Sequence, residues 1–243
     1  MTTLHLKSDG KQAIHRLTKT HLKRVFGISQ PLKYLGLETE DVESIKIRNE
    51  SFNIDLSRSV IVEADQNTFR KMTRLANAGH EVLSVINRLQ GCLGDPEINE
   101  KLLNLRLQNI AGPFNDINLD FMGLYNNSIA DLLTSLFLSH TKMLANTVVI
   151  SATFTDHAFF KACNNCSGNE LLKFERALKR STLQSWNVKP LNIQRYSGGT
   201  KQNKSVYMYW GIWLVKRKDI YLGTTTMPTT TLDEIKLFNL KGW

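Results

Sequence analysis

Apolar residues in this chain follow two different spacings, and the alternation of the two predicts an α/β fold. Short apolar runs predict buried strands at 60–62, 114–121 and 146–156. Apolar residues three and four positions apart predict helices, at 9–27, 66–89, 97–107, 128–144 and 169–186, although 103–110 fits a strand as well. Helices between strands require long crossover connections. The pattern therefore predicts a mainly parallel sheet with helices on both faces.

The two ends of the chain break this alternation. Residues 31–47, after the first helix, predict a second short helix or a helix-turn unit. Near the other end, 191–199 and 205–218 alternate apolar and polar residues around a polar turn, which predicts an antiparallel hairpin. The Thr-rich tail 221–243 fits either a last packed helix or a linker that docks onto a protein partner.

Composition excludes several classes of protein. With 243 residues, 42% of them hydrophobic, the chain is long enough to bury a sizeable core and is not a disordered protein. Its apolar runs are far shorter than the roughly 20 residues that cross a bilayer, and its first residues contain no apolar signal core. We therefore expect an intracellular, cytoplasmic protein with no membrane partner.

Three cysteines do not make a disulfide framework in a chain of this length, which favours a reducing compartment. Cys163 and Cys166 form a Cys-x-x-Cys pair that would be half of a zinc site, a redox motif or two small loop residues. Zinc takes four ligands, and only His157 and the distant Cys92 are candidates to complete the set. We therefore predict no metal site.

Charge is distributed unevenly along the chain, which has a net charge of +9. Residues 173–218 hold eleven Lys and Arg and one acid, whereas 37–156 hold sixteen acids and ten bases. Such a basic segment is typical of a face that binds a polyanion, although it also fits a solvated surface. The hairpin bases are the predicted nucleic-acid contacts: Arg195, Lys201, Lys204, Lys216, Arg217 and Lys218.

Strand, acid and helix follow one another twice, at Glu63 and at Asp120, before a third strand and the hairpin. This order resembles the Rossmann-like class I methyltransferases, which use S-adenosylmethionine and end in an antiparallel hairpin. The resemblance implies a Rossmann-like domain at 55–220. The basic helical segment 1–54 would be part of that domain or packed on it, and 221–243 would be a tail or docking segment.

The resemblance also assigns site residues. The acid after the second strand binds the cofactor ribose in that family, which implies Glu63, with Asp65 as the alternative. The fourth strand of the family ends facing the transferred methyl group, at the place of Asp120 here. Asp120 would align the acceptor, although it would equally suit a helix cap. Tyr125 and Asn126, just beyond it, would line a substrate pocket by stacking and hydrogen bonding.

Two features separate the sequence from the family pattern. The Asp-x-x-Gly step that begins at Asp120 is similar to the Asp-Pro-Phe-Gly motif of transfer-RNA guanine methyltransferases but has no proline. The segment 37–51, where a glycine-rich cofactor loop is expected, contains no glycine. Two hypotheses follow: a methyltransferase acting on RNA or DNA, or an inactive scaffold of the same fold that binds nucleic acid or a protein through its basic half.

Overall fold

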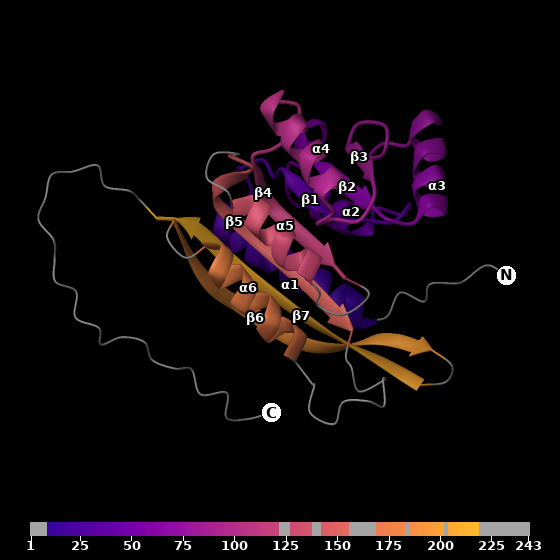
Figure 1. Ribbon diagram of the computed structural model, residues 1–243. Coiled ribbons are helices and arrows are strands. Elements are labelled where there is room, and N and C mark those ends of the chain that lie inside the picture. The colour runs from indigo at the N-terminus through magenta and orange to yellow at the C-terminus, as the bar shows by residue number, and fades with distance from the viewer. Residues whose placement is uncertain are drawn as a thin grey trace, which may run out of the picture.

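The structure is a computed structural model that describes residues 9–121, 127–137, 142–155, 169–182, 185–201 and 204–218 (Figure 1). Within these residues, seven strands form one sheet: β1 (Tyr34–Leu37), β2 (Val60–Glu63), β3 (Asn87–Gln90), β4 (Phe114–Asp120), β5 (Leu144–Thr155), β6 (Trp186–Lys201) and β7 (Lys204–Arg217). The described helices are α1 (Asp9–Phe26), α2 (Glu43–Asn49), α3 (Gln66–Asn77), α4 (Pro96–Leu107), α5 (Asn127–Phe137) and α6 (Asn169–Thr182), with a 3-10 turn at Leu56–Arg58. None of these helices is long and apolar enough to cross a membrane.

The strands lie in the order β3-β2-β1-β4-β5-β7-β6. The first five are parallel, β7 runs antiparallel to β5, and β6 pairs antiparallel with β7. This arrangement confirms the predicted α/β fold with its closing hairpin. Because the chain crosses to β2 on one side of β1 and to β4 on the other, the strand order reverses at β1. In open α/β sheets ligands bind at such a reversal, outside the carboxyl ends of the strands.

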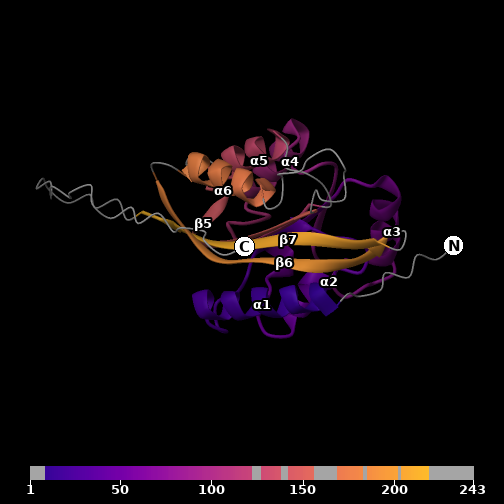
Figure 2. The ribbon, with the colours of Figure 1, turned by 90° about the horizontal axis from the view of Figure 1, so that it is seen from below.

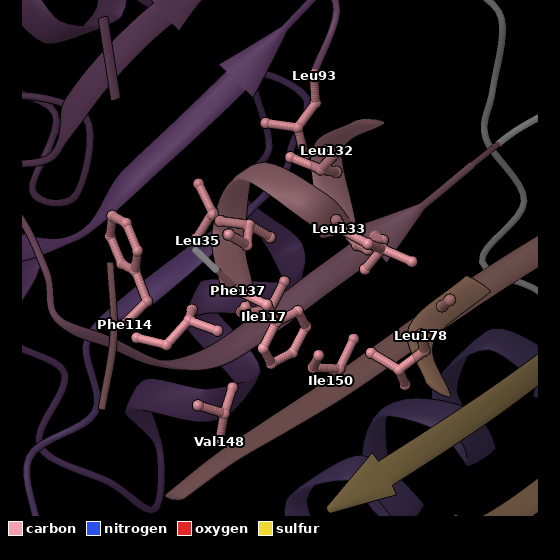
Figure 3. Close-up of a cluster of buried hydrophobic side chains, with 14 of the residues drawn as sticks. Leu35, Leu93, Phe114, Ile117, Leu132, Leu133, Phe137, Val148, Ile150 and Leu178 are labelled. Atoms are coloured by element: carbon pink, nitrogen blue, oxygen red, sulfur yellow. The ribbon is translucent and has the colours of Figure 1, made fainter. Parts of the chain in front are cut away.

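Helices cover both faces of the sheet (Figures 1 and 2). On one face, α1, α2 and α3 bury a cluster that includes Leu22, Ile45 and Met72. On the other face, α4, α5 and α6 pack on a larger cluster (Figure 3), whose members include Leu35, Ile117, Leu133, Ile150 and Leu178. The parallel strands are therefore buried from both sides, as their nearly continuous apolar sequences predict.

The closing hairpin is longer than the sheet that it joins. β7 pairs with β5 from Lys216, opposite Thr147, to Met208, opposite Thr155. Beyond Met208 the hairpin continues as two strands alone, as far as the pair Lys201 and Lys204 (Figure 1). Its tip therefore projects past the carboxyl end of β5, whereas Lys216 lies at the amino end of that strand.

Two short strands occupy positions where the sequence predicted helix. β1 lies inside 31–47, so the segment 1–54 supplies a central strand of the sheet as well as α1 and α2. β3 begins inside 66–89 and ends one residue beyond it, because α3 ends before Gly79, which has a positive φ of 83°. Both strands have only four residues, too few for a period of two to be distinguished from part of a helical pattern.

Candidate functional site

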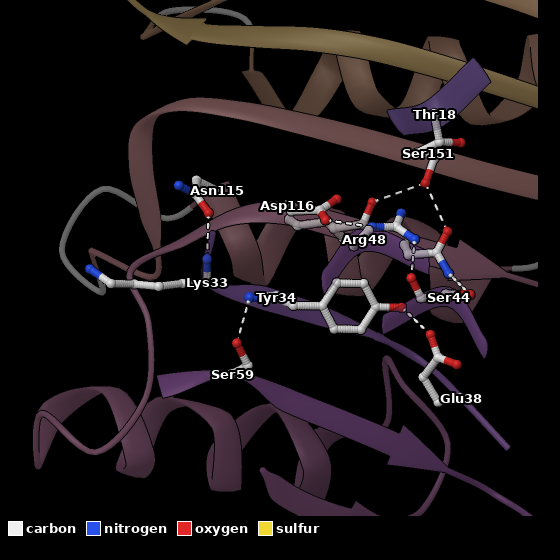
Figure 4. Close-up of polar contacts among 12 residues, drawn as sticks. Thr18, Lys33, Tyr34, Glu38, Ser44, Arg48, Ser59, Asn115, Asp116 and Ser151 are labelled. Atoms are coloured by element: carbon white, nitrogen blue, oxygen red, sulfur yellow. Dashed lines mark hydrogen bonds and ion pairs between the residues drawn. The ribbon is translucent and has the colours of Figure 1, made fainter. Parts of the chain in front are cut away.

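Polar side chains replace apolar ones on one face of the three central strands. This polar face consists of alternate residues of β4 and β5, with Tyr34 of β1 and Glu38 just after β1: Tyr34, Glu38, Asp116, Asn118, Asp120, Ser151 and Thr153. It lies under α1 and α2 (Figure 4). A polar group buried without a hydrogen bond is costly, so the partners of these side chains determine the local structure.

An ion pair between Arg48 and Asp116 holds α2 onto the polar face. Arg48 Nε lies 2.6 Å from Asp116 Oδ2, and the two side chains are 2% and 1% exposed (Figure 4). Arg48 also donates to the carbonyl of Ser44, at 3.1 Å, and its guanidinium lies over the Tyr34 ring, 5.2 Å from the ring centre. Asp116 is therefore a buried carboxylate, although it lies only four residues before the end of β4. A central parallel strand has no solvent face, so its carboxylate needs a buried cation.

Tyr34 and Glu38 form a second buried pair along β1. The Tyr34 hydroxyl donates to Glu38 Oε1 at 2.5 Å. A Cβ atom at Gly36, the residue between them, would lie 2.3 Å from the Tyr34 hydroxyl oxygen. Gly36 is therefore the residue that lets the tyrosine ring fold along the strand.

Burial raises the pKa of the Glu38 carboxyl to about 7, although the hydrogen bond from Tyr34 and the charge of Arg48 both oppose the rise. The charge of Asp120, on the neighbouring polar strand, adds to the rise. Near neutral pH, Glu38 is thus divided between its neutral and charged forms. The carboxyl groups of Glu38 and Asp120 therefore lie after β1 and at the end of β4, beside the point where the strand order reverses.

The connection from β1 to α2 makes a tight turn without glycine. Val42, which is fully buried, precedes α2 with a φ of 44°, a left-handed conformation that is rare for β-branched residues. Backbone strain of this kind costs about 1–3 kcal/mol and concentrates at functional sites. The loop that follows the first strand, 38–42, therefore has no glycine, as the sequence of 37–51 indicated.

Glu63 and Asp65, the two predicted cofactor residues, have different roles. Glu63 ends β2, is half-buried, and accepts the backbone N–H of Asp65 at 2.7 Å. Burial raises the pKa of the Glu63 carboxyl. Asp65 is the exposed N-cap of α3, and the backbone N–H of Thr68 holds its pKa below the usual value. Asp65 therefore caps a helix, whereas Glu63 accepts hydrogen bonds from the backbone that follows its own strand.

Asp120 ends β4 and lines a small polar cavity. Its neighbours along the cavity wall come from four other elements, and the lining residues are Ile14, His15, Thr18, Ser44, Asn118, Asp120, Thr153 and Trp210. The sequence did not indicate His15 or Thr18, because their positions in α1 fit an ordinary amphipathic helix. The polar face could have been found from the alternate polar residues Asp116, Asn118 and Asp120 of β4.

The predicted nucleic-acid residues divide between opposite edges of the sheet. Three lie at the carboxyl edge. Arg195 pairs with Tyr209, which is itself opposite Phe154 of β5, and Lys201 and Lys204 lie beyond the end of β5. Lys216, Arg217 and Lys218 lie at the opposite, amino edge, where Arg217 stacks over the Trp186 ring at 5.9 Å. The sequence placed all six together, and the structure shows that they cannot surround one site.

Several predicted features fall outside the described residues. They are Tyr125 and Asn126 of the substrate pocket, His157, Cys163 and Cys166 of the possible metal or redox motif, and the tail 221–243. Cys92 is exposed, and within the residues that the structure describes it is a free cysteine. Within the described part of the chain, no three His, Cys, Asp or Glu side chains come together as metal ligands.

No protein-family model matches the sequence, and no curated protein matches it. Solved structures that match in fold include a putative transferase from Pyrococcus horikoshii, at 13% identity over 84% of this chain and 64% of that chain, with a TM-score of 0.47. A putative rRNA-methylase from Clostridium thermocellum matches at 8% identity over 86% of this chain and 95% of that chain, also with a TM-score of 0.47. TYW2 from M. jannaschii, solved with AdoMet, matches at 12% identity over 88% of this chain and 78% of that chain, with a TM-score of 0.45.

The chain thus spans less than two thirds of the P. horikoshii transferase that it matches. The fold itself rests on the strand order and register described above.

Replacing Arg48 by Met should lower the free energy of unfolding by about 3–5 kcal/mol, because it leaves the Asp116 carboxylate buried without its cation. Removing both charges, as Arg48→Met with Asp116→Leu, should recover most of this loss. Lys101→Met, which breaks an exposed pair with Glu97, should cost less than about 1 kcal/mol. Urea denaturation of the variants measures all three, and an equal loss in the single and double variants would contradict the assignment.

Glu38 should make the protein less stable as the pH rises. Its pKa in the folded protein is above that of an unfolded glutamate, so the folded state holds the extra proton. The free energy of unfolding should therefore fall by about 3 kcal/mol between roughly pH 4.5 and pH 7. Glu38→Gln should remove this fall, and denaturation curves across the range test it. Parallel pH profiles for the two proteins would rule out a neutral Glu38.

Proposed function

We propose that this protein is an S-adenosylmethionine-dependent methyltransferase that acts on nucleic acid. The observation that carries the proposal is the placement of Glu63 and Asp120. These two acids end β2 and β4, the strands that lie on either side of β1. They therefore flank the reversal of strand order, where open α/β sheets bind their ligands.

The described residues fit most of the cofactor. Among the described residues, the hydrogen bonds to Glu63 come from backbone N–H groups, and its carboxylate would accept from the two ribose hydroxyls as well. The loop at 38–42 lacks glycine but carries the exposed acid Asp41, whose negative charge suits the cationic sulfonium and ammonium groups. The neighbouring Glu40 is paired with Lys71 at 3.2 Å. Bound S-adenosylmethionine would supply an electrophilic methyl group. In this chain the loop would bind the cofactor through charge and side chains, because it has no glycine to bring the backbone close.

Asp120 would position the acceptor. Methyl transfer to a nucleophilic atom depends mainly on the alignment of the reactants, so a carboxylate that accepts a hydrogen bond from the acceptor is sufficient. Asp120 is suited to this role because it ends a buried strand and its carboxylate faces a polar cavity.

The projecting hairpin favours nucleic acid as the target. Its tip carries the opposite pair Lys201 and Lys204, and Arg195 lies nearer the sheet on the same strand as Lys201. Like charges directly opposite each other destabilise a hairpin, so this arrangement is better explained by a polyanionic partner than by folding alone. A two-stranded ribbon is also of a size that the DNA major groove admits.

A second function is favoured by the strained, glycine-free loop at Val42. The chain would then be a non-catalytic scaffold of the same fold that binds nucleic acid through the same hairpin. The two functions differ in one property, which is binding of the cofactor.

Calorimetric titration with S-adenosylmethionine and S-adenosylhomocysteine should show saturable binding to the folded protein. Glu63→Gln should weaken binding at least about tenfold, because it replaces a charge-assisted hydrogen bond by a neutral one. Asp65→Asn is the matched control, since asparagine keeps the cap of α3 and the affinity should not change. No heat from well-folded protein, with no shift in melting temperature, would refute the methyltransferase and leave the scaffold.

Neutralising the hairpin tip should weaken nucleic-acid binding, because phosphate contacts release counterions. Arg195→Gln, Lys201→Gln and Lys204→Gln together should reduce the slope of log affinity against log salt by about 0.9 per lost contact on duplex DNA. Lys216→Gln, Arg217→Gln and Lys218→Gln carry the same change in charge at the opposite edge and should have a smaller effect. Fluorescence anisotropy with labelled DNA and RNA measures both, and equal effects would show that position at the carboxyl edge is unimportant.

A further inference from the structure

Two basic segments from opposite ends of the sequence come together on one face of the sheet. α1 packs on the hairpin of β6 and β7 (Figure 2), and its residues Leu22 and Phe26 belong to the same buried cluster as Trp210 and Ile212 of β7. α1 contains five Lys and Arg, and each of the two strands contains three. The only acid in the three elements is Asp9. The fold thus joins the basic N-terminal helix to the basic hairpin.

The outward face of α1 is basic. From residue 13 to the end of the helix, the exposed residues are Ala13, Arg16, Thr20, Lys23 and Arg24. Three of these five are bases, and none is an acid or a large apolar residue. Lys19, beside them, is paired with Glu50 at 3.2 Å, whereas the three exposed bases form no ion pair with any residue that the structure describes. Their charges are therefore available to a partner.

The hairpin adds exposed bases to the same face. Lys189 of β6 lies directly opposite Leu214 of β7, which packs against the buried cluster beneath α1. Residues directly opposite in an antiparallel pair share a face, and so do residues two positions apart along a strand. Lys189 and Lys216 therefore both lie on the face that α1 covers, and both are exposed. Arg217, the next residue, lies over the Trp186 ring instead.

These bases form a track that follows the hairpin from one edge of the sheet to the other. α1 passes from the carboxyl edge, where Ile14 lines the polar cavity, toward the amino edge, and its last turn carries Lys23 and Arg24 (Figure 2). The 16 residues of β6, at about 3.3 Å each, make the track about 50 Å long. The basic track consists of the exposed bases and the two lysines at the hairpin tip: Arg16, Lys23, Arg24, Lys189, Lys201, Lys204 and Lys216.

A line of positive charge of this length fits double-stranded nucleic acid. A face that binds single strands presents aromatic rings on which bases stack. The aromatic side chains that the structure describes in α1, β6 and β7 are buried or half-buried: Phe26, Trp186, Tyr209, Trp210 and Trp213. A membrane surface would require large apolar side chains among the bases, and the exposed face of α1 has none. The track therefore offers contacts to phosphates rather than to bases or lipid.

We propose that the basic track binds the backbone of a nucleic-acid duplex over about 15 base pairs, which is the number that spans about 50 Å. The inference rests on the nucleic-acid target of the proposed function and deepens it by naming the form and length of that target. The hairpin tip would hold one end of the duplex, and the last turn of α1 with Lys189 and Lys216 would hold the other. Because phosphates are the same in every sequence, the track would position the duplex without selecting its sequence.

Duplexes of different length test the track. Fluorescence anisotropy with the full-length protein, at one protein per duplex, gives the slope of log affinity against log salt. The slope should steepen from about 8 to about 16 base pairs, because the longer duplex reaches more bases of the track, and should then stay constant to about 24 base pairs. Equal slopes for the two shorter duplexes would overturn the proposal.

Variants of exposed bases test which face the duplex contacts. Lys23→Gln with Arg24→Gln should reduce the slope on the longer duplexes by about 0.9 per lost contact, and should have less effect on the shortest, which can still bind at the hairpin tip. The matched control is Arg176→Gln with Arg180→Gln, two exposed bases of α6 on the other face of the sheet, and the slope should not change (Figure 2).

Lys189→Gln is a second variant, on β6, and should reduce the slope by one contact in the same way. The side chains replaced are all exposed, and thermal melting checks that each variant is folded. An equal loss in the α6 control, or no loss in either track variant, would overturn the proposal.

The nature of the partner and the fate of the proposed function are decided separately. A single strand of equal length that binds as tightly as the duplex at equal salt would overturn the proposal. Binding of polyglutamate but not of duplex would overturn it in favour of an acidic protein. Length-dependent binding by a protein with no affinity for S-adenosylmethionine would refute the methyltransferase and leave the track standing. Cofactor binding with no length dependence would refute the track alone.

Discussion

The buried ion pair between Arg48 and Asp116 is the interaction on which the rest of the site depends. It joins α2 to β4 with both side chains almost fully excluded from water. Through Arg48 it also fixes the carbonyl of Ser44 and the ring of Tyr34. Buried pairs contribute little net stability, because desolvation of the charges offsets their attraction. Here the pair instead fixes the position of α2 against β4. The loop after β1 and the wall of the cavity are positioned with α2.

Whether a feature of the site could be predicted from the sequence depends on how far apart its residues lie along the chain. Glu63 and Asp120 were found because a buried strand followed by an acid is a local pattern, and the structure places both at the carboxyl edge. The pairing of Arg48 with Asp116 was not, because it joins residues 68 positions apart. The cavity was invisible for the same reason, since its walls come from five elements. β1 was missed because its four residues sit between stretches with stronger helical patterns.

The basic half of the chain shows a different limit of sequence reasoning. A count of charges treats Lys201 and Lys216 as neighbours in one segment, although a hairpin sends them to opposite ends of the sheet. Register decides this separation, and register depends on where the turn falls. The sequence predicted the hairpin, but only the observed pairing of its strands shows that the basic residues lie at opposite ends of the sheet.

Tyr34 and Gly36 also bear on how relatives of this chain can be recognised. Because the Tyr34 ring occupies the space that a side chain at Gly36 would fill, Gly36 can gain a side chain only if Tyr34 also changes. An alignment that matched Gly36 to the first glycine of a nucleotide-binding loop would put a packing residue in the place of a ligand-binding one. Relatives should therefore be sought by an aromatic residue two positions before a glycine, with an acid two positions after it.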